Sequence, residues 1–490
     1  MKKFIFCLLC LSTCLLFVGC SNFNPPNNVN EYTMDLSYNA EEKSVSGKMQ
    51  LSYINQSDNT MNEVKFHLYP NAFRENSKAN VVSLANSQKA YPNGKSYGNI
   101  TINNVKLNDS QCQSAIEGDD QNILSVPLAE ELYPDDRVNI EIEFVTVLAN
   151  INHRLGYGEN CINICNFYPV ACVYENGEFM TDIYNSNGDP FYSQIAKYNV
   201  IFTYDNCFTL ASTGEQQLEK TDTKTTAKIS ANGVRDFALV LSEKFNVITS
   251  QYKDTEIKYY YTTDTQPENS IKIAKQTVEL FSEKIGEYPY NQLSVVETNF
   301  VHGGMEYPNL VMISDDLANY EDYQMVIVHE IVHQWWYGVV GNNQYQYGWI
   351  DEGLTEYTTA LFYDYYPEYN KTSAQVVRNA STAYSTFMKV YSDVLGQVDT
   401  SMNRKLNQFA TEPEYVYNTY TKGLLMFATI KDIIGEKDFF KCLSYYYKTC
   451  AYSEVKPEQL VWCFVKASGK NLENLFNAWI DGKVIIMGVE

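Results

Sequence analysis

The chain has 490 residues, with 37 lysines and arginines against 59 aspartates and glutamates, which gives a formal net charge of −22 at pH 7. Such an acidic surface argues against nucleic-acid binding, which depends on basic side chains that contact phosphates. With 45% hydrophobic residues, the chain is long enough to bury the cores of at least two domains.

The first 20 residues have the features of a secretory signal. Two lysines precede an apolar stretch, Phe4 to Val18, which is too short to span a bilayer comfortably. The stretch runs into Phe-Val-Gly-Cys-Ser, which resembles a bacterial lipoprotein processing site with Cys20 as the lipidated residue. Residues 21–30 are polar and contain a Pro-Pro pair, as expected of a flexible tether. We therefore predict an exported protein held to a membrane surface by a lipid, on the extracytoplasmic side, with ordinary secretion as the alternative.

A β-rich domain is predicted over residues 31–249. Short stretches such as Val138 to Phe144 alternate between apolar and polar residues, a period typical of strands with one buried face. Turn-forming pairs such as Asn93-Gly94 separate these stretches. The pattern indicates a mainly antiparallel β domain.

The pattern changes after about residue 250. A strand is predicted at 256–262, a helix at about 268–285 and a strand at 293–298, and helical periodicity prevails from about residue 323 onward. Residues 250–490 are therefore predicted to form a second, mainly α domain.

The most informative motif is His329-Glu330-Ile331-Val332-His333, followed by Glu352 nineteen residues later. Two histidines four apart on a helix face the same side, so both can bind one zinc ion, and Glu330 can take a proton from the water that the ion holds. Glu352 opens the next predicted helix, from 351 to about 366, and a helical hairpin would return its carboxylate to the metal. Two histidines, one carboxylate and an open fourth position are typical of a hydrolytic zinc site.

The alternative to a zinc site is a buried helix with two histidines that have only a structural role. The chain contains only 5 histidines, so a chance match to this motif is improbable. The zinc interpretation is favoured.

Three motifs, in the same order along the chain, resemble those of the M1 family of zinc aminopeptidases, the aminopeptidase N and leukotriene A4 hydrolase group. The resemblance covers about residues 30 to 482 and implies that the second domain is a thermolysin-like catalytic domain. The motifs are the exopeptidase loop Gly303-Gly304-Met305-Glu306-Tyr307, the zinc signature with His329, His333 and Glu352, and the tyrosine segment Tyr420-Thr421-Lys422-Gly423.

The resemblance assigns roles to the residues of the first and third motifs. Glu306 would bind the free α-ammonium group of a peptide by a charge-assisted hydrogen bond, and Gly303, Gly304 and Met305 would complete this substrate loop. The hydroxyl of Tyr420 would stabilise the oxyanion beside the metal.

Glu356 and Tyr307 lie close in sequence to the predicted site residues. Glu356 lies one helical turn after Glu352 and is a candidate partner for the second N–H of a zinc-bound histidine, with a solvated helix face as the alternative. Family members most often have Asn where this chain has Tyr307, which we expect to change the rim of the pocket. The sequence alone locates no second anchor for the substrate amine.

The sequence thus predicts a membrane-anchored zinc aminopeptidase that hydrolyses the first peptide bond of peptides with free N-termini, using one Zn²⁺ to activate water. A thermolysin-type endopeptidase shares the zinc pattern but does not require the Glu306 loop or Tyr420. A surface binding protein on an inactive peptidase fold is the third possibility, and the intact ligands, base and tyrosine speak against it. Nothing in the sequence favours an epoxide hydrolase on the same scaffold.

Overall fold

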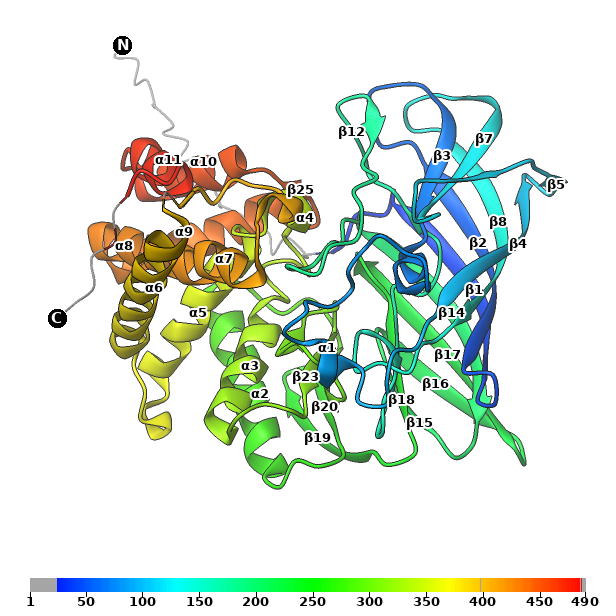
Figure 1. Ribbon diagram of the computed structural model, residues 1–490, viewed down its shortest axis with the longest axis horizontal. Coiled ribbons are helices and arrows are strands. Elements are labelled where there is room, and N and C mark those ends of the chain that lie inside the picture. The colour runs from blue at the N-terminus through cyan, green and yellow to red at the C-terminus, as the bar shows by residue number, and fades with distance from the viewer. Residues whose placement is uncertain (1–23, 397, 485, 487–490) are drawn as a thin grey trace, which may run out of the picture.

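The computed structural model describes residues 24–396, 398–484 and 486 (Figure 1). The predicted signal peptide over residues 1–20, with Cys20, lies outside the described residues, as do the first three residues of the predicted tether. Within the described part of the chain, no helix combines the length and the apolarity needed to cross a membrane.

An eight-stranded sheet forms the outer part of the N-terminal region, on the right in Figure 1. In its central strand β1 (Asn30–Asn39), buried and exposed side chains alternate without exception, as predicted for a strand with one face on the core. All described pairings in the sheet are antiparallel except that between β1 and β14. In spatial order the strands are β16 (Glu215–Lys220), β17 (Lys224–Val234), β14 (Ala196–Asp205), β1, β2 (Ser44–Ile54), β8 (Arg137–Val147), β4 (Asn99–Leu107) and β5 (Ser110–Gln111).

Two four-stranded antiparallel sheets and a short antiparallel pair, β12 (Tyr174–Glu175) with β13 (Glu178–Phe179), complete the N-terminal region. The expectation of a mainly antiparallel β domain is therefore confirmed, with the β1–β14 pair as the parallel exception. One small sheet contains β15 (Thr209–Ser212), β18 (Ala238–Ser242), β10 (Ile162–Cys165) and β9 (Leu155–Tyr157), and the other contains β11 (Val170–Ala171), β3 (Met61–His67), β7 (Ile123–Leu132) and β6 (Ala115–Glu117).

A five-stranded sheet begins the second region. Its centre is parallel, and α2 (Pro267–Lys284) makes the crossover between β20 (Thr255–Tyr261) and β21 (Gln292–Thr298). The predicted strand, helix and strand at 256–262, 268–285 and 293–298 agree with β20, α2 and β21 to within one residue. The predicted boundary after residue 249 falls inside β19, which pairs with β20. The strands are, in spatial order, β19 (Asn246–Tyr252), β20 (Thr255–Tyr261), β21 (Gln292–Thr298), β23 (Leu310–Ser314) and β22 (Gly304–Met305).

Helices fill the rest of the second region, on the left in Figure 1. The helix α3 (Tyr320–Val332) begins after Asn319, whose side chain accepts a hydrogen bond from the backbone N–H of Asp322 at 2.9 Å. It packs on α5 (Asp351–Tyr365), and α5 packs on α8 (Lys422–Ile434). The other long helices are α5 (Asp351–Tyr365), α6 (Ser373–Leu395), α8 (Lys422–Ile434), α9 (Glu436–Cys450), α10 (Pro457–Ser468) and α11 (Glu473–Ile480).

A buried arginine joins the two regions. Arg235, which follows β17, donates from Nη1 to the backbone oxygen of Ser193 at 3.0 Å and to Oε1 of Glu454 at 3.1 Å. Its guanidinium lies against the backbone of Gly341, where an added Cβ would come within 2.2 Å of the guanidinium carbon. Residue 341 therefore has to be glycine for this contact to form.

Candidate active site

The three predicted metal ligands meet at one point. His329 lies in the last turn of α3, His333 caps the end of that helix, and Glu352 is the second residue of α5. The two Nε2 atoms are 3.0 Å apart, and Oε2 of Glu352 is 3.3 Å from Nε2 of His329 and 3.2 Å from Nε2 of His333. A tetrahedral metal with bonds of about 2.0–2.1 Å holds its ligand atoms about 3.3 Å apart, so these three atoms fit one ion.

The hydrogen bonds around His333 support this fit. Its Nδ1 lies 2.9 Å from the backbone oxygen of Trp336 and 3.2 Å from the hydroxyl of Thr355. A carbonyl oxygen can only accept, so Nδ1 carries a proton and Nε2 is free to bind a metal. Although burial lowers the pKa of His333, the carboxylates of Glu352 and Glu306 raise it well above its ordinary value. The site therefore favours a positive charge between these groups.

Sequence reasoning missed these two partners of His333, and it placed Glu356 in a similar role. Oε1 of Glu356 is 3.6 Å from Nδ1 of His329, a distance for an ion pair and too long for a hydrogen bond. Glu356 does face the metal ligands and line their cavity, so its assignment as the partner of one of the two histidines stays a prediction.

Glu330, the predicted base, faces the same cavity of about 340 Å³ as the metal ligands. Only 5% of its surface is exposed, and its carboxyl group packs against the backbone of Gly304. A Cβ at Gly304 would lie 2.2 Å from Oε1 of Glu330, so the substrate loop can approach the base only because this residue is glycine. Burial, followed by the charge of Glu306, raises the pKa of Glu330 well above its ordinary value, so its carboxylate is a stronger base than an exposed one.

Glu306, the predicted amine anchor, follows the edge strand β22 and is 3% exposed. Together, Glu306, Glu352 and Asp189 place carboxylate oxygens within 4.8 Å of one another. Burial, followed by the charge of Asp189, raises the pKa of Glu306 to about 8. A cation such as an ammonium group would relieve this crowding of negative charge.

Asp189 is the second acidic group that the sequence alone does not locate. It belongs to the loop before β14, in the N-terminal β region, and it lines the cavity next to Arg154. The two residues form an ion pair in which Arg154 is buried and Asp189 partly buried. Its sequence context, Gly188-Asp189-Pro190, reads as an ordinary turn, so only the fold reveals the residue.

Tyr307 corrects one expectation. Its side chain is fully buried, its hydroxyl donates to Oδ1 of Asn166 at 2.6 Å, and it is not among the residues that line the cavity. The expected change to the pocket rim is therefore wrong. Neighbouring residues of an extended segment point to opposite sides, so Glu306 faces the cavity while Tyr307 faces the β region.

Tyr420 lies in a single π-helical turn, Tyr417–Thr421, and its side chain lines the cavity. Its ring stacks on that of His329 with 6.2 Å between centroids. Just beyond it, Gly423 meets Gly353 of α5, where an added Cβ would come within 2.5 Å of the opposite Cα. This close helix contact, which side chains would prevent, explains how Tyr420 comes to lie over the metal ligands.

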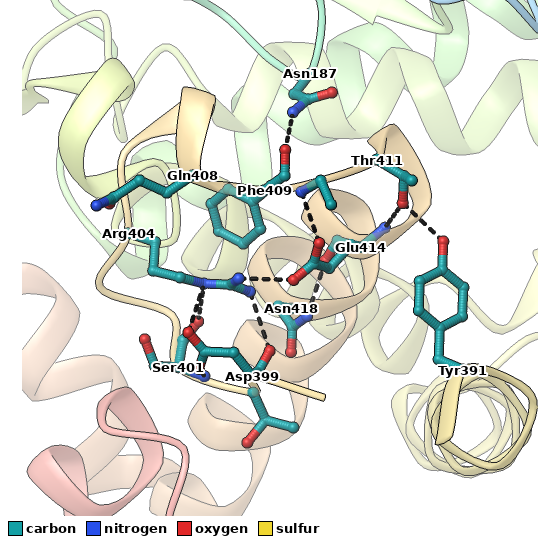
Figure 2. Close-up of polar contacts among 12 residues, drawn as sticks. Asn187, Tyr391, Asp399, Ser401, Arg404, Gln408, Phe409, Thr411, Glu414 and Asn418 are labelled. Atoms are coloured by element: carbon teal, nitrogen blue, oxygen red, sulfur yellow. Dashed lines mark hydrogen bonds and ion pairs between the residues drawn. The ribbon is translucent and has the colours of Figure 1, made fainter. Parts of the chain in front are cut away.

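Polar contacts hold the segment before Tyr420, as Figure 2 shows. Nη1 of Arg404 donates to Oε1 of Glu414 at 2.6 Å, and the backbone oxygen of Glu414 accepts from Nδ2 of Asn418 at 2.9 Å. Asn187, two residues before Asp189, donates from Nδ2 to the backbone oxygen of Phe409 at 3.0 Å. The loop that carries Asp189 and the segment that leads to Tyr420 are therefore directly connected.

Comparisons with known proteins agree with this geometry. Residues 269–479 match the model of the peptidase family M1 domain. Aminopeptidase M1-A of Oryza sativa subsp. japonica is 24% identical over 223 residues, which cover 43% of this chain and 25% of that protein. Aminopeptidase N of Streptomyces lividans is 25% identical over 226 residues, which cover 43% of this chain and 25% of that protein. The matched part thus spans about a quarter of the length of these curated relatives.

The likeness to a solved structure extends over nearly the whole chain. An M1 zinc metallopeptidase from Deinococcus radiodurans superimposes with a TM-score of 0.64 and 14% identity, covering 95% of this chain and 97% of that chain. The two-part fold, a β-rich region followed by a helical region, is therefore shared, and the predicted fold class is confirmed.

Proposed function

We propose that this chain, which carries a peptidase family M1 domain over residues 269–479, is a zinc aminopeptidase that removes residues from the N-terminus of peptides. One observation carries the proposal. A single cavity contains a three-ligand metal site with a buried glutamate beside it, and also two further carboxylates, the buried Glu306 and the partly buried Asp189, that suit an ammonium group.

His329, His333 and Glu352 would hold the ion. When bound, zinc acts as a Lewis acid and lowers the pKa of a water molecule toward neutrality. Glu330 takes the proton of the attacking water and later delivers it to the leaving amine. The hydroxyl of Tyr420 donates a hydrogen bond to the oxyanion that develops on the scissile carbonyl.

The two carboxylates favour an aminopeptidase over an endopeptidase. If an internal stretch of a peptide occupied the cavity, the buried Glu306 would face a neutral amide and receive no cationic partner from the substrate, which is costly for a buried charge. Asp189 already pairs with Arg154, but its negative charge adds to the cost at Glu306. A free N-terminus supplies that partner and fixes which peptide bond reaches Glu330. A mutant of the Deinococcus protein has been crystallised with a Tyr-Ser-Ala substrate, which supports short peptides as the substrate class.

The test compares one peptide in two forms, with a free and with an acetylated N-terminus, each incubated with and without a metal chelator. We expect stepwise loss of residues from the free peptide alone, stopped by the chelator and restored by Zn²⁺. Mass spectrometry of the digests would show this directly. Internal cuts in both peptides would replace the proposal with an endopeptidase, and intact peptides in every tube would favour a binding protein.

We also propose that the protein is exported and anchored to a membrane through a lipid on Cys20. The sequence of residues 1–20 supports this, and β1 begins at Asn30, which leaves room for a short tether. We expect Cys20→Ser to move the protein from the membrane fraction to the soluble fraction of the native host, with its peptidase activity intact. Wild-type protein in the soluble fraction would contradict the anchor.

A further inference from the structure

A buried glutamine joins the amine anchor to the start of the helix that carries a metal ligand. Gln344 opens the short helix α4 (Gln344–Tyr347) and is 2% exposed. Its Nε2 donates to Oε1 of Glu306 at 2.6 Å and to Oδ2 of Asp351 at 2.8 Å. Both hydrogens of one amide group are therefore used on two buried carboxylates.

The orientation of this amide is fixed by charge. Turning the side chain over would place its oxygen against two carboxylate oxygens, which repel it. In the observed orientation, Oε1 of Gln344 is buried and finds no hydrogen-bond partner among the residues that the structure describes. A buried polar atom without a partner destabilises a fold, so the arrangement is better explained by what the NH₂ group does for Glu306 than by stability.

Further hydrogen bonds fix Asp351, at the other end of the Gln344 contact, and the backbone of Glu306. Asp351 accepts a second hydrogen bond, from Nδ2 of Asn342 at 3.1 Å, and is the residue directly before the metal ligand Glu352. The backbone oxygen of Glu306 accepts from Nε2 of Gln334 at 3.3 Å, and Gln334 directly follows the metal ligand His333. The Glu306 anchor is thus tied, by side chain and by backbone, to residues adjacent to two metal ligands.

We propose that Gln344 is a positioning residue that sets the distance between the amine anchor and the metal centre. Because it holds one carboxylate oxygen of Glu306, the other is presented to the substrate ammonium in a fixed direction. This inference rests on the proposed aminopeptidase function, and it adds a residue that does not line the cavity and does not touch the substrate.

The first test replaces Gln344 with leucine, which removes both donors at similar size. We expect KM for a tripeptide with a free N-terminus to rise about tenfold or more, as when a hydrogen bond to a charged group is lost, with a smaller change in kcat. Gln344→Met, which keeps the length of the side chain, should behave in the same way. The matched control is Gln346→Leu, in the same short helix and outside the cavity. Zinc content should agree among the three variants.

The second test separates positioning from a merely structural role by a double-mutant cycle with Glu306→Gln. If Gln344 acts through Glu306, the double variant should have the same KM as the single variant Glu306→Gln. Additive effects on KM, or a Gln344→Leu protein that behaves like Gln346→Leu, would overturn this inference alone, because the wild type would still cleave. A zinc-loaded wild type that leaves both peptide forms intact would instead overturn the proposed function and this inference with it.

Discussion

Replacing Glu330 with alanine is expected to lower kcat by about 10²–10⁴-fold, the contribution of a well-placed general base. The bound metal should remain, because the ligand atoms belong to His329, His333 and Glu352. The carboxyl group of Glu330 is the one that lies against the substrate loop at Gly304, so no neighbouring carboxylate replaces it at the point where water attacks. Kinetics on a short peptide, together with zinc analysis of the same sample, would measure both effects.

The isosteric variant Glu330→Gln refines this experiment, since it keeps the contact with Gly304 and removes only the proton acceptor. Glu321→Gln is the matched control, because Glu321 lies at the start of the same helix, with 69% of its side chain exposed, and pairs with Lys371 at 3.1 Å. We expect the control to keep its activity. Turnover by Glu330→Gln at the wild-type rate would show that another group is the base.

The metal site could be predicted from the sequence because its three ligands lie close together in the chain. The spacing of His329 and His333 requires only one helical turn. His333 caps α3 and lies just outside it, but its backbone is still helical (φ −59°, ψ −16°), so the two side chains still face the same side. Glu352 required one further assumption, that the helix beginning at residue 351 packs on the helix of the two histidines, and it does so even though the short helix α4 lies between them in the chain. The contact between α3 and α5 satisfies it.

The parts that sequence reasoning missed depend on contacts between distant segments. Asp189 reaches the cavity from a loop of the β region, and Gln344 is recognised only by the two buried carboxylates that it joins. Neither residue has a local pattern that distinguishes it from an ordinary turn or helix residue. The misplacement of Tyr307 has a related cause. Adjacency in sequence to Glu306 suggested a shared pocket, whereas an extended backbone sends neighbours to opposite sides.

Replacing Tyr420 with phenylalanine tests the second contributor to catalysis. The ring contacts with His329 and Tyr415 do not involve the hydroxyl, so we expect the π-helical turn to stay in place. Loss of one hydrogen-bond donor to the oxyanion should lower kcat by about 10²–10³-fold, with little change in KM, because the contact forms mainly in the transition state. Steady-state kinetics on the free tripeptide would measure the two constants separately.

Two further tyrosines decide how this result is interpreted. Tyr417 lies in the same π-helical turn but stacks on Phe387 and is not among the residues that line the cavity, so Tyr417→Phe should match the wild type. Tyr415 does line the cavity, 5.9 Å from Tyr420 between ring centroids, and is the only rival hydroxyl of a tyrosine among the described lining residues. A drop in kcat for Tyr415→Phe with wild-type kinetics for Tyr420→Phe would transfer the oxyanion role to Tyr415. The stacking of Tyr420 on a metal-binding histidine favours the opposite outcome, because it holds the ring of Tyr420 directly beside a metal ligand.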